Sequence, residues 1–343
     1  MTTGNSIAAL FFWQVPERLQ VYLKKGLNDY PQVKLLFPDD ISQEALLKLA
    51  PEADVIIGWR PSKEFLDAAT KLRLFINPGV GVQHLTDLFK EINQTRKVTL
   101  ANGHGNTYFT AQHAVALLLA LTNKIIPHHN WMVDGQWRKG DDDAQSMPMR
   151  DRKIGLLGYG ALNTKVHKFL SGFDVEFHIL KRDWSRERIA ELPTKIEKYS
   201  DKDLQKFLEI IDTLIVAVPL TSKTKGLIGK RELELLGSEG LLVTVARGEV
   251  IDEESLYLAL KNKTIAGAAI DVWYNYRPEQ DANGKKYPAN YPFYELDNVV
   301  LSPHRGASPM NDLKRWDEVI ENISRVARNE KDFLNVVNLE NEY

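Results

Sequence analysis

The chain contains no cysteine, so disulfide bonds, thiol catalysis and thiolate metal ligands are excluded. A strong charge of one sign is also lacking, because the net charge is −2 and no long basic run occurs. We therefore expect no nucleic-acid partner and no binding to a membrane surface. No apolar stretch of about 18 residues and no secretory signal is recognisable, so we predict a cytoplasmic protein in a reducing compartment.

The eight histidines show no spacing typical of a metal site. His128 and His129 are adjacent and would face different ways on a helix. We predict that the protein holds no metal ion.

A strand-like apolar run at residues 153–157 ends at Gly158, just where a helical pattern begins. Gly158 would allow a tight turn, and Gly160 would let the backbone approach a pyrophosphate at the start of the helix. The third glycine of the usual motif is Asn163 here, and a plain turn before an ordinary helix is the alternative. Gly158, Gly160, Ala161 and Leu162 are the predicted contacts to a dinucleotide.

Further strand-sized apolar runs occur at residues 175–180, 214–218, 241–245, 266–272 and 299–301, with helical patterns between them. This alternation predicts a doubly wound α/β fold with a mainly parallel sheet of about six strands. Ligands bind such sheets at the carboxyl ends of the strands. The candidate ligand-binding residues at the ends of these runs or just past them are Lys181, Arg182, Val218, Pro219, Thr221, Ala246, Arg247, Asp271 and His304.

The first hundred residues repeat the alternation, with apolar runs at 7–12, 33–37, 55–57, 74–76 and 98–100. A helix over residues 111–126 would carry the chain into the second unit, and an apolar stripe between residues 313 and 327 would form the returning helix. We predict two Rossmann-like or flavodoxin-like lobes with a cleft between them. Residues 1–105 with 306–343 would form a discontinuous substrate domain, and residues 106–305 a dinucleotide-binding domain.

Several of these strand ends together resemble the D-isomer-specific 2-hydroxyacid dehydrogenase family along nearly the whole chain. The matching segments are Asn77-Pro78-Gly79-Val80-Gly81-Val82, Ala111-Gln112-His113-Ala114, residues 158–163, Val218-Pro219-Leu220-Thr221, residues 245–252, residues 268–272 and Ser302-Pro303-His304. The resemblance implies hydride transfer between a nicotinamide and a small 2-oxo or 2-hydroxy acid, and it suggests a homodimer.

The chemistry of this reaction assigns roles to two of the side chains. Arg247 would hold the substrate carboxylate and polarise the carbonyl, although a surface salt bridge is its alternative role. His304 would pass a proton to the carbonyl oxygen. Gly79, Val80 and Gly81 would direct N–H groups toward the carboxylate, with a plain turn as the alternative.

One position departs from the family pattern. The glutamate that the family places five positions after the strand-end aspartate is Tyr276 in this chain, counted from Asp271. Tyrosine is neutral near pH 7, since its pKa is about 10, but its hydroxyl could orient His304. Glu279 or Glu295 would replace the carboxylate if the loop folds back, and otherwise the pKa of His304 should be less elevated than in relatives that keep the glutamate.

Cofactor choice depends on the end of the 175–180 strand. An NAD site would place an acidic residue about 20 positions after the glycine motif, but Lys181 and Arg182 stand there. Both cations favour the 2′-phosphate of NADP(H), while Asp183 keeps NAD(H) possible. Asp271 resembles the family residue that binds the nicotinamide carboxamide.

The sequence leaves the role of one loop undecided. Residues 273–294 form a long loop rich in tyrosine and proline. This loop either forms a wall of the substrate pocket or is a surface insertion whose aromatic side chains pack on one another.

The sequence also leaves two alternatives to the reductase. Because the glutamate is missing, the protein could instead be a nucleotide-sensing binding protein on the same fold. A dehydrogenase acting on a phosphorylated hydroxy acid is the other alternative, and it would need further cations at the site.

Overall fold

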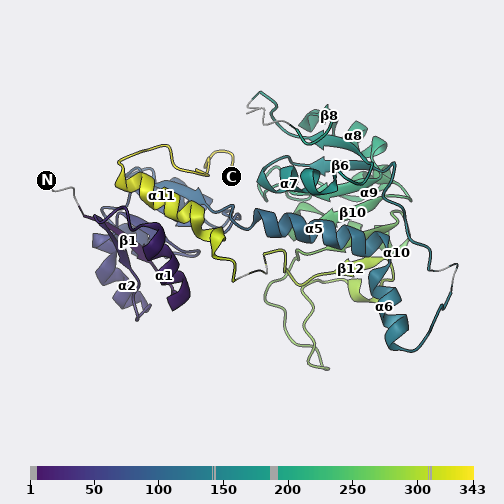
Figure 1. Ribbon diagram of the computed structural model, residues 1–343, viewed down its shortest axis with the longest axis horizontal. Helices are drawn as coiled ribbons and strands as arrows, with labels where there is room; N and C mark the ends of the chain where they lie inside the picture. Colours follow the sequence, from purple (N-terminus) through teal and green to yellow (C-terminus); the bar gives the residue numbers. More distant parts are fainter. Residues whose placement is uncertain (1–5, 141, 143, 186–191, 308, 310) are drawn as a thin grey trace. The chain divides into compact units, whose positions relative to one another are not determined.

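The computed structural model describes residues 6–140, 142, 144–185, 192–307, 309 and 311–343. The chain divides into two compact units (Figure 1). The first unit contains Met1–Asn106 and Pro309–Tyr343, and the second contains Thr107–Ser308. The assignment of the substrate to the first unit and of the dinucleotide to the second stays a prediction.

The first unit is built on a parallel sheet of five strands in the order β2-β1-β3-β4-β5. The strands are β1 (Ile7–Phe11), β2 (Val33–Leu36), β3 (Val55–Ile57), β4 (Leu74–Asn77) and β5 (Thr99–Asn102). The order reverses direction between β1 and β3. In open α/β sheets such a switch point is the usual place for a ligand, outside the carboxyl ends of the strands.

Alternate residues of these strands serve opposite faces of the sheet, as the period of two in a strand requires. In β1, Ala9 and Phe11 pack with α1 (Glu17–Gly26) and α11 (Asp317–Ala327) on one face, whereas Leu10 packs on the other. The second face is covered by α2 (Gln43–Leu49), α3 (Lys63–Ala68) and α4 (Thr86–Ile92). Helix α11 therefore ties the C-terminal segment to the first unit (Figure 1).

The second unit has a parallel sheet of seven strands in the order β12-β11-β10-β9-β6-β7-β8. The strands are β6 (Lys153–Leu157), β7 (Glu176–Leu180), β8 (Ile196–Tyr199), β9 (Thr213–Val216), β10 (Leu241–Thr244), β11 (Gly267–Ile270) and β12 (Val299–Leu301). The fold class is thus the predicted doubly wound α/β fold, but the strand count was wrong by one. Strand β8 was missed because this four-residue edge strand contains two charged residues and so lacks an apolar run.

Helices cover both faces of this second sheet. Helices α5 (Thr107–Thr122) and α7 (Ala161–Leu170) pack on one face. The opposite face carries α8 (Leu204–Ile210), α9 (Lys230–Leu236) and α10 (Glu253–Lys261).

The helix predicted over residues 111–126 is interrupted. Lys124 adopts a left-handed φ of 50°, so α5 ends before it and α6 (Ile125–Val133) starts a new direction. The two helices meet at a bend of 63°. Within the described residues, no helix taken singly has the length and apolarity to cross a bilayer, and α5 with α6 meets those criteria only as a bent pair.

Candidate active site

The predicted dinucleotide turn lies between β6 and α7. Gly158 has a φ of +83°, and a Cβ there would lie 2.8 Å from Cγ1 of Val218, so both conformation and space favour glycine. Around Gly160, which precedes the first residue of α7, a Cβ would meet no atom within 4 Å. Open space beside a helix N-terminus fits a bound pyrophosphate.

Asn163 replaces the third glycine and is fully buried. Its amide donates to the carbonyl oxygen of Gly158 at 2.6 Å, with longer contacts to the carbonyls of Leu157 and Ile215 at 3.4 Å. Asn163 therefore binds α7 to the ends of β6 and β9. Its side chain does not separate the helix from the strands, although it is larger than the usual glycine.

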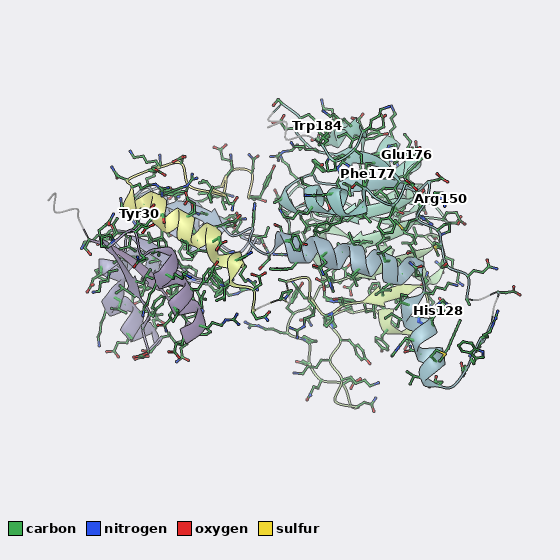
Figure 2. All side chains as sticks on the ribbon, viewed as in Figure 1. Tyr30, His128, Arg150, Glu176, Phe177 and Trp184 are labelled. Atoms are coloured by element: carbon green, nitrogen blue, oxygen red, sulfur yellow. The ribbon has the colours of Figure 1, made fainter. Side chains whose placement is uncertain are left out.

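A cationic group follows β7 and includes a residue that the sequence pattern did not reveal. Trp184, labelled in Figure 2, follows β7. Its ring lies 5.4 Å from Nζ of Lys181 and 4.8 Å from Nζ of Lys198, which is on β8. The Trp184 indole N–H donates to the carbonyl of Tyr199 at 2.8 Å, which fixes the ring beside β8. Lys198 escaped notice because β8 itself was not predicted.

The turns after β9 and β10 contain the next predicted contacts. Oγ1 of Thr224 lies 3.0 Å from Oγ1 of Thr221 and donates to the carbonyl of Pro219, so both predicted residues belong to one closed turn. Val218 and Ala246 pack against the core of the second unit. The guanidinium of Arg247 is half-buried and donates to the carbonyl of Ala246 at 2.6 Å.

Arg247 forms no ion pair with any carboxylate among the described residues. The alternative role of Arg247, a surface salt bridge, is therefore not found among the described residues. Burial lowers the pKa of Arg247, but a guanidinium keeps its charge at physiological pH. A half-buried cation without a carboxylate partner is suited to bind an anionic ligand.

His304 and Tyr276 are brought together from different strand ends. The Tyr276 hydroxyl lies 2.7 Å from Nδ1 of His304, and it also accepts the backbone N–H of Trp273 at 3.3 Å. Since one lone pair of the hydroxyl already serves Trp273, its hydrogen is free to point to Nδ1 of a neutral His304. That leaves Nε2 as the ring nitrogen available for a ligand.

The electrostatics of this pair differ from those of a histidine beside a carboxylate. Partial desolvation lowers the pKa of His304 below its ordinary value; the Asp271 carboxylate opposes the shift and the Arg247 guanidinium reinforces it. Burial raises the pKa of Tyr276, so its hydroxyl stays protonated near neutral pH. Neither Glu279 nor Glu295 forms a hydrogen bond to His304 within the described residues.

Asp271 occupies the end of β11 and organises the turn that carries His304. Its carboxylate accepts from the Ser302 hydroxyl at 2.5 Å and from the N–H groups of Arg305 and Gly306 at 2.6 and 3.0 Å. Nε2 of His113, on α5, lies 2.9 Å from Oγ of Ser302. Because Ser302 donates to Asp271, it must accept from His113, which therefore carries its proton on Nε2.

The cost of burying Asp271 is met by these donors. Nε2 of His113 also lies 3.4 Å from Oδ1 of Asp271. Burial alone would raise the pKa of Asp271, but His113, the Ser302 hydroxyl and the two backbone N–H groups hold this pKa below its ordinary value. His304 itself has a left-handed φ of 56°, a backbone conformation that this clamp maintains. The sequence pattern predicted Asp271 as a cofactor contact and did not reveal that it supports the His304 turn.

The predicted carboxylate contacts Gly79, Val80 and Gly81 lie in the first unit, just past β4. Neither glycine has a positive φ, so the turn does not use the left-handed conformation that glycine allows. The amide of Asn77 donates instead to the carbonyls of Gly79 and Gly81, and the amide of Asn102 donates to the carbonyl of Val80 at 2.7 Å. In a trans peptide the next N–H points the opposite way, so the N–H groups of residues 80–82 face away from both asparagines.

Those N–H groups have no acceptor among the described residues. Asn77 and Asn102 are buried and paired in register at the ends of β4 and β5. The residues 79–81 thus form a turn whose carbonyls are occupied and whose donors are open, which is an arrangement able to bind a carboxylate.

Several aromatic side chains of the 273–294 loop pack on one another or on α10, whereas Tyr276 contacts His304. Tyr287 and Tyr294 stack with centroids 3.9 Å apart, and Tyr291 stacks on Tyr257 of α10 at 5.2 Å. No group of three or more His, Asp or Glu side chains in the described part of the chain is arranged to hold a metal ion.

Comparisons with known proteins agree with this fold. The family model described as "D-isomer specific 2-hydroxyacid dehydrogenase, NAD binding domain" matches residues 115–306. A glyoxylate reductase of Thermofilum pendens is 32% identical over 285 residues, covering 81% of this chain and 79% of that protein. A D-3-phosphoglycerate dehydrogenase of Archaeoglobus fulgidus is 32% identical over 276 residues, covering 78% of this chain but only 48% of that protein.

Among solved structures, the D-isomer specific 2-hydroxyacid dehydrogenase of Xanthobacter autotrophicus Py2 in complex with NADPH and MES is similar in fold. The TM-score is 0.77, with 22% identity over 98% of this chain and 100% of that one. The family match falls within the unit that holds Arg247, Tyr276 and His304. The chain belongs to the D-isomer specific 2-hydroxyacid dehydrogenase family, whose members are nicotinamide-dependent oxidoreductases.

Proposed function

We propose that the protein is a reductase of small 2-oxo acids that forms the D-2-hydroxy acid and favours NADP(H). The observation that carries the proposal is the grouping of His304, its hydroxyl partner Tyr276 and the unpaired Arg247 in the unit with the dinucleotide turn. When bound, the nicotinamide supplies the hydride. The residues of the chain bind and polarise the acid and supply the proton.

In this mechanism Arg247 binds the substrate carboxylate and draws electron density toward the carbonyl oxygen. His304 donates the proton from Nε2 to that oxygen, because Nδ1 is engaged by Tyr276. In the first unit, the N–H groups of the 79–81 turn are the proposed contacts for a carboxylate. Tyr276 orients the imidazole but adds no negative charge, so the protonated form of His304 is stabilised less than by a glutamate.

The preference for NADP(H) rests on charge. Lys181, Arg182 and Lys198 lie after β7 or on β8, where a 2′-phosphate would be attracted, and no acidic residue takes the first position after β7. NAD(H) stays the alternative cofactor. The test is steady-state oxidation of NADPH and NADH side by side with glyoxylate, pyruvate, hydroxypyruvate, phenylpyruvate and branched oxo acids.

Turnover that prefers NADPH would support both the reaction and the role of Lys181 and Arg182. One competing function is a nucleotide-sensing protein with little catalysis, because Tyr276 beside His304 supplies no carboxylate charge. Binding of either cofactor with no turnover of any acid would favour that alternative.

We also propose a homodimer formed through the second unit. Helix α6 and the residues after it expose large apolar side chains, with Val133 71% and Trp137 76% exposed. Monomeric proteins seldom leave such side chains in contiguous groups on the surface. A second copy of the chain would cover them.

A further inference from the structure

We infer that Trp59, supported by Trp13, forms the contact surface for the substrate side chain, and that the enzyme therefore prefers 2-oxo acids with an aromatic or bulky apolar group. This inference rests on the proposed function. It is argued from the first unit alone.

The two tryptophans mark the switch point of the first sheet. Trp13 and Trp59 follow β1 and β3, the neighbouring strands between which the strand order reverses. Their rings meet edge to face with centroids 4.9 Å apart, and the buried Trp316 stacks on Trp13 at 5.7 Å. Because Trp13 is held from both sides, the aromatic surface is rigid.

Trp59 also borders the turn that would hold the carboxylate. A Cβ built on Gly79 would lie 3.6 Å from the indole nitrogen of Trp59, so the indole edge reaches the first residue of the 79–81 turn. The backbone carbonyl of Trp59 accepts a hydrogen bond from Nε2 of His84 at 2.6 Å, which fixes the Trp59 backbone beside this turn. A substrate whose carboxylate binds the 79–81 N–H groups would have its side chain next to the indole.

The exposure of Trp59 is consistent with a ligand contact. Its side chain is 41% exposed, although its neighbours Val55, Ile56 and Ile57 on β3 are fully buried. Burial of this ring against an apolar group would gain free energy that a glyoxylate molecule, which has no side chain, cannot provide.

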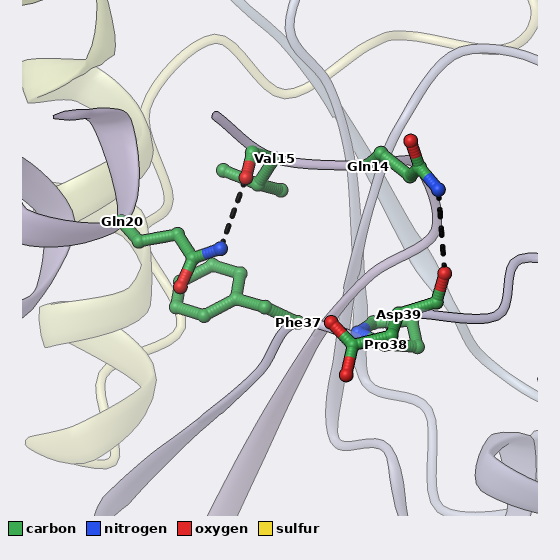
Figure 3. Close-up of a pocket in the computed structure, with 6 residues that line it drawn as sticks. All are labelled: Gln14, Val15, Gln20, Phe37, Pro38 and Asp39. Carbon is green, nitrogen blue, oxygen red and sulfur yellow. Dashed lines mark hydrogen bonds between the residues drawn. The ribbon is translucent and has the colours of Figure 1, made fainter. Parts of the chain in front are cut away.

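A hollow at the same sheet edge is less suited to an acid than the surface beside Trp59. This cavity of about 310 Å³ lies past β1 and β2 and is lined by Gln14, Val15, Gln20, Phe37, Pro38 and Asp39 (Figure 3). The side-chain amides of Gln14 and Gln20 donate to the carbonyls of Asp39 and Val15, and the Asp39 carboxylate would repel an anion. The substrate is thus better placed on the β3 and β4 side of Trp13.

The test compares phenylpyruvate with glyoxylate in the full-length enzyme and in the Trp59→Ala and Trp59→Phe variants. For Trp59→Ala we expect kcat/KM for phenylpyruvate to fall about 10- to 100-fold more than kcat/KM for glyoxylate, mainly through KM. Trp59→Phe should recover much of the loss because it restores an aromatic face. The matched control is Arg60→Ala, the exposed neighbour, which should change neither value.

Equal losses with both acids would overturn the inference, since Trp59 would then act on the shared carboxylate or on the fold. Wild-type turnover of glyoxylate with none of phenylpyruvate would also overturn it and leave the proposed function standing. Turnover of 3-phosphohydroxypyruvate that is lost in Arg60→Ala would assign the position to a phosphorylated acid instead.

Failure of the proposed function is distinguished by a binding measurement. If no acid is turned over, binding of D-phenyllactate is measured by isothermal titration calorimetry. Saturable binding to the wild type that is weakened in Trp59→Ala and kept in Trp59→Phe supports the aromatic contact surface without catalysis. No binding to the wild type, or equal binding to Trp59→Ala, overturns the inference.

Discussion

At the scale of single residues, the exchange of a carboxylate for Tyr276 determines how His304 titrates. Reduction needs the protonated imidazole, and the lowered pKa of His304 means that this form is lost at a lower pH. We expect Tyr276→Glu to move the alkaline fall of kcat/KM for reduction upward by about one pH unit or more, because a carboxylate favours the imidazolium. The measurement is the pH–rate profile of both enzymes.

The control is Tyr276→Phe, which removes the hydroxyl that contacts Nδ1 and should lower kcat without moving the fall upward. A wild-type profile that already falls at high pH, and keeps that position when Glu279 and Glu295 are both replaced by glutamine, would contradict the argument.

A second histidine should govern stability in acid. His167 is fully buried, with Nδ1 2.8 Å from the Tyr159 hydroxyl and Nε2 2.8 Å from the Thr194 hydroxyl. Burial lowers its pKa to about 4, whereas the unfolded chain binds the proton near pH 6.5. The unfolded state thus holds more protons between these values, so the free energy of unfolding should decline as pH falls from about 6.5 to 4.

We expect this site alone to remove up to about 3 kcal/mol over that interval. His167→Gln keeps polar groups but does not titrate, so its free energy of unfolding should depend less on pH than that of the wild type. Urea unfolding at pH 7.5 and pH 5 measures the difference. Identical pH dependences would show that His167 does not carry the effect.

At the scale of elements, the turn after β10 depends on close packing against the end of β11. A Cβ at Gly248 would lie 2.4 Å from the carbonyl oxygen of Trp273, which is backbone and cannot yield easily. We expect Gly248→Ala to destabilise the second unit by about 1–3 kcal/mol and to displace Arg247, with a large loss of kcat/KM.

The matched control for this prediction is Gly172→Ala, where a Cβ would meet no atom within 4 Å. Thermal unfolding and kcat/KM are measured for both variants. A Gly248→Ala enzyme with normal activity would mean that the two strand ends can separate without disturbing the site.

Individual helices and strands show where the hydrophobic pattern of the sequence predicts structure correctly. Buried strands of a parallel sheet are continuous apolar runs, so β6, β9 and β10 were recognisable from hydrophobicity. β8 was not, since an edge strand buries little, and neither was the break between α5 and α6, because the left-handed conformation of Lys124 has no signal in residue type.

At the scale of the whole molecule, the exposed apolar side chains of α6 and of the residues after it predict that the protein forms a homodimer. We expect the wild type to be a dimer by light scattering after gel filtration. Val133→Asp should shift it toward the monomer, because an aspartate would be buried without a partner. Val21→Asp, on an exposed position of α1, is the control and should stay dimeric. A monomeric wild type would refute the proposed homodimer.

The sequence by itself determined the fold class, the glycine turn between β6 and α7 and the residue types at the strand ends, because apolar periodicity and glycine conformation are local properties. It also identified Tyr276 as the departure from the family. Only the tertiary structure decided what these side chains contact: the Tyr276 hydroxyl on Nδ1 of His304, the clamp of Asp271 on the 302–306 turn, and the carbonyls of the 79–81 turn on Asn77 and Asn102. These contacts join residues from separate strands, and their geometry arises from sheet register and packing, which no local pattern records.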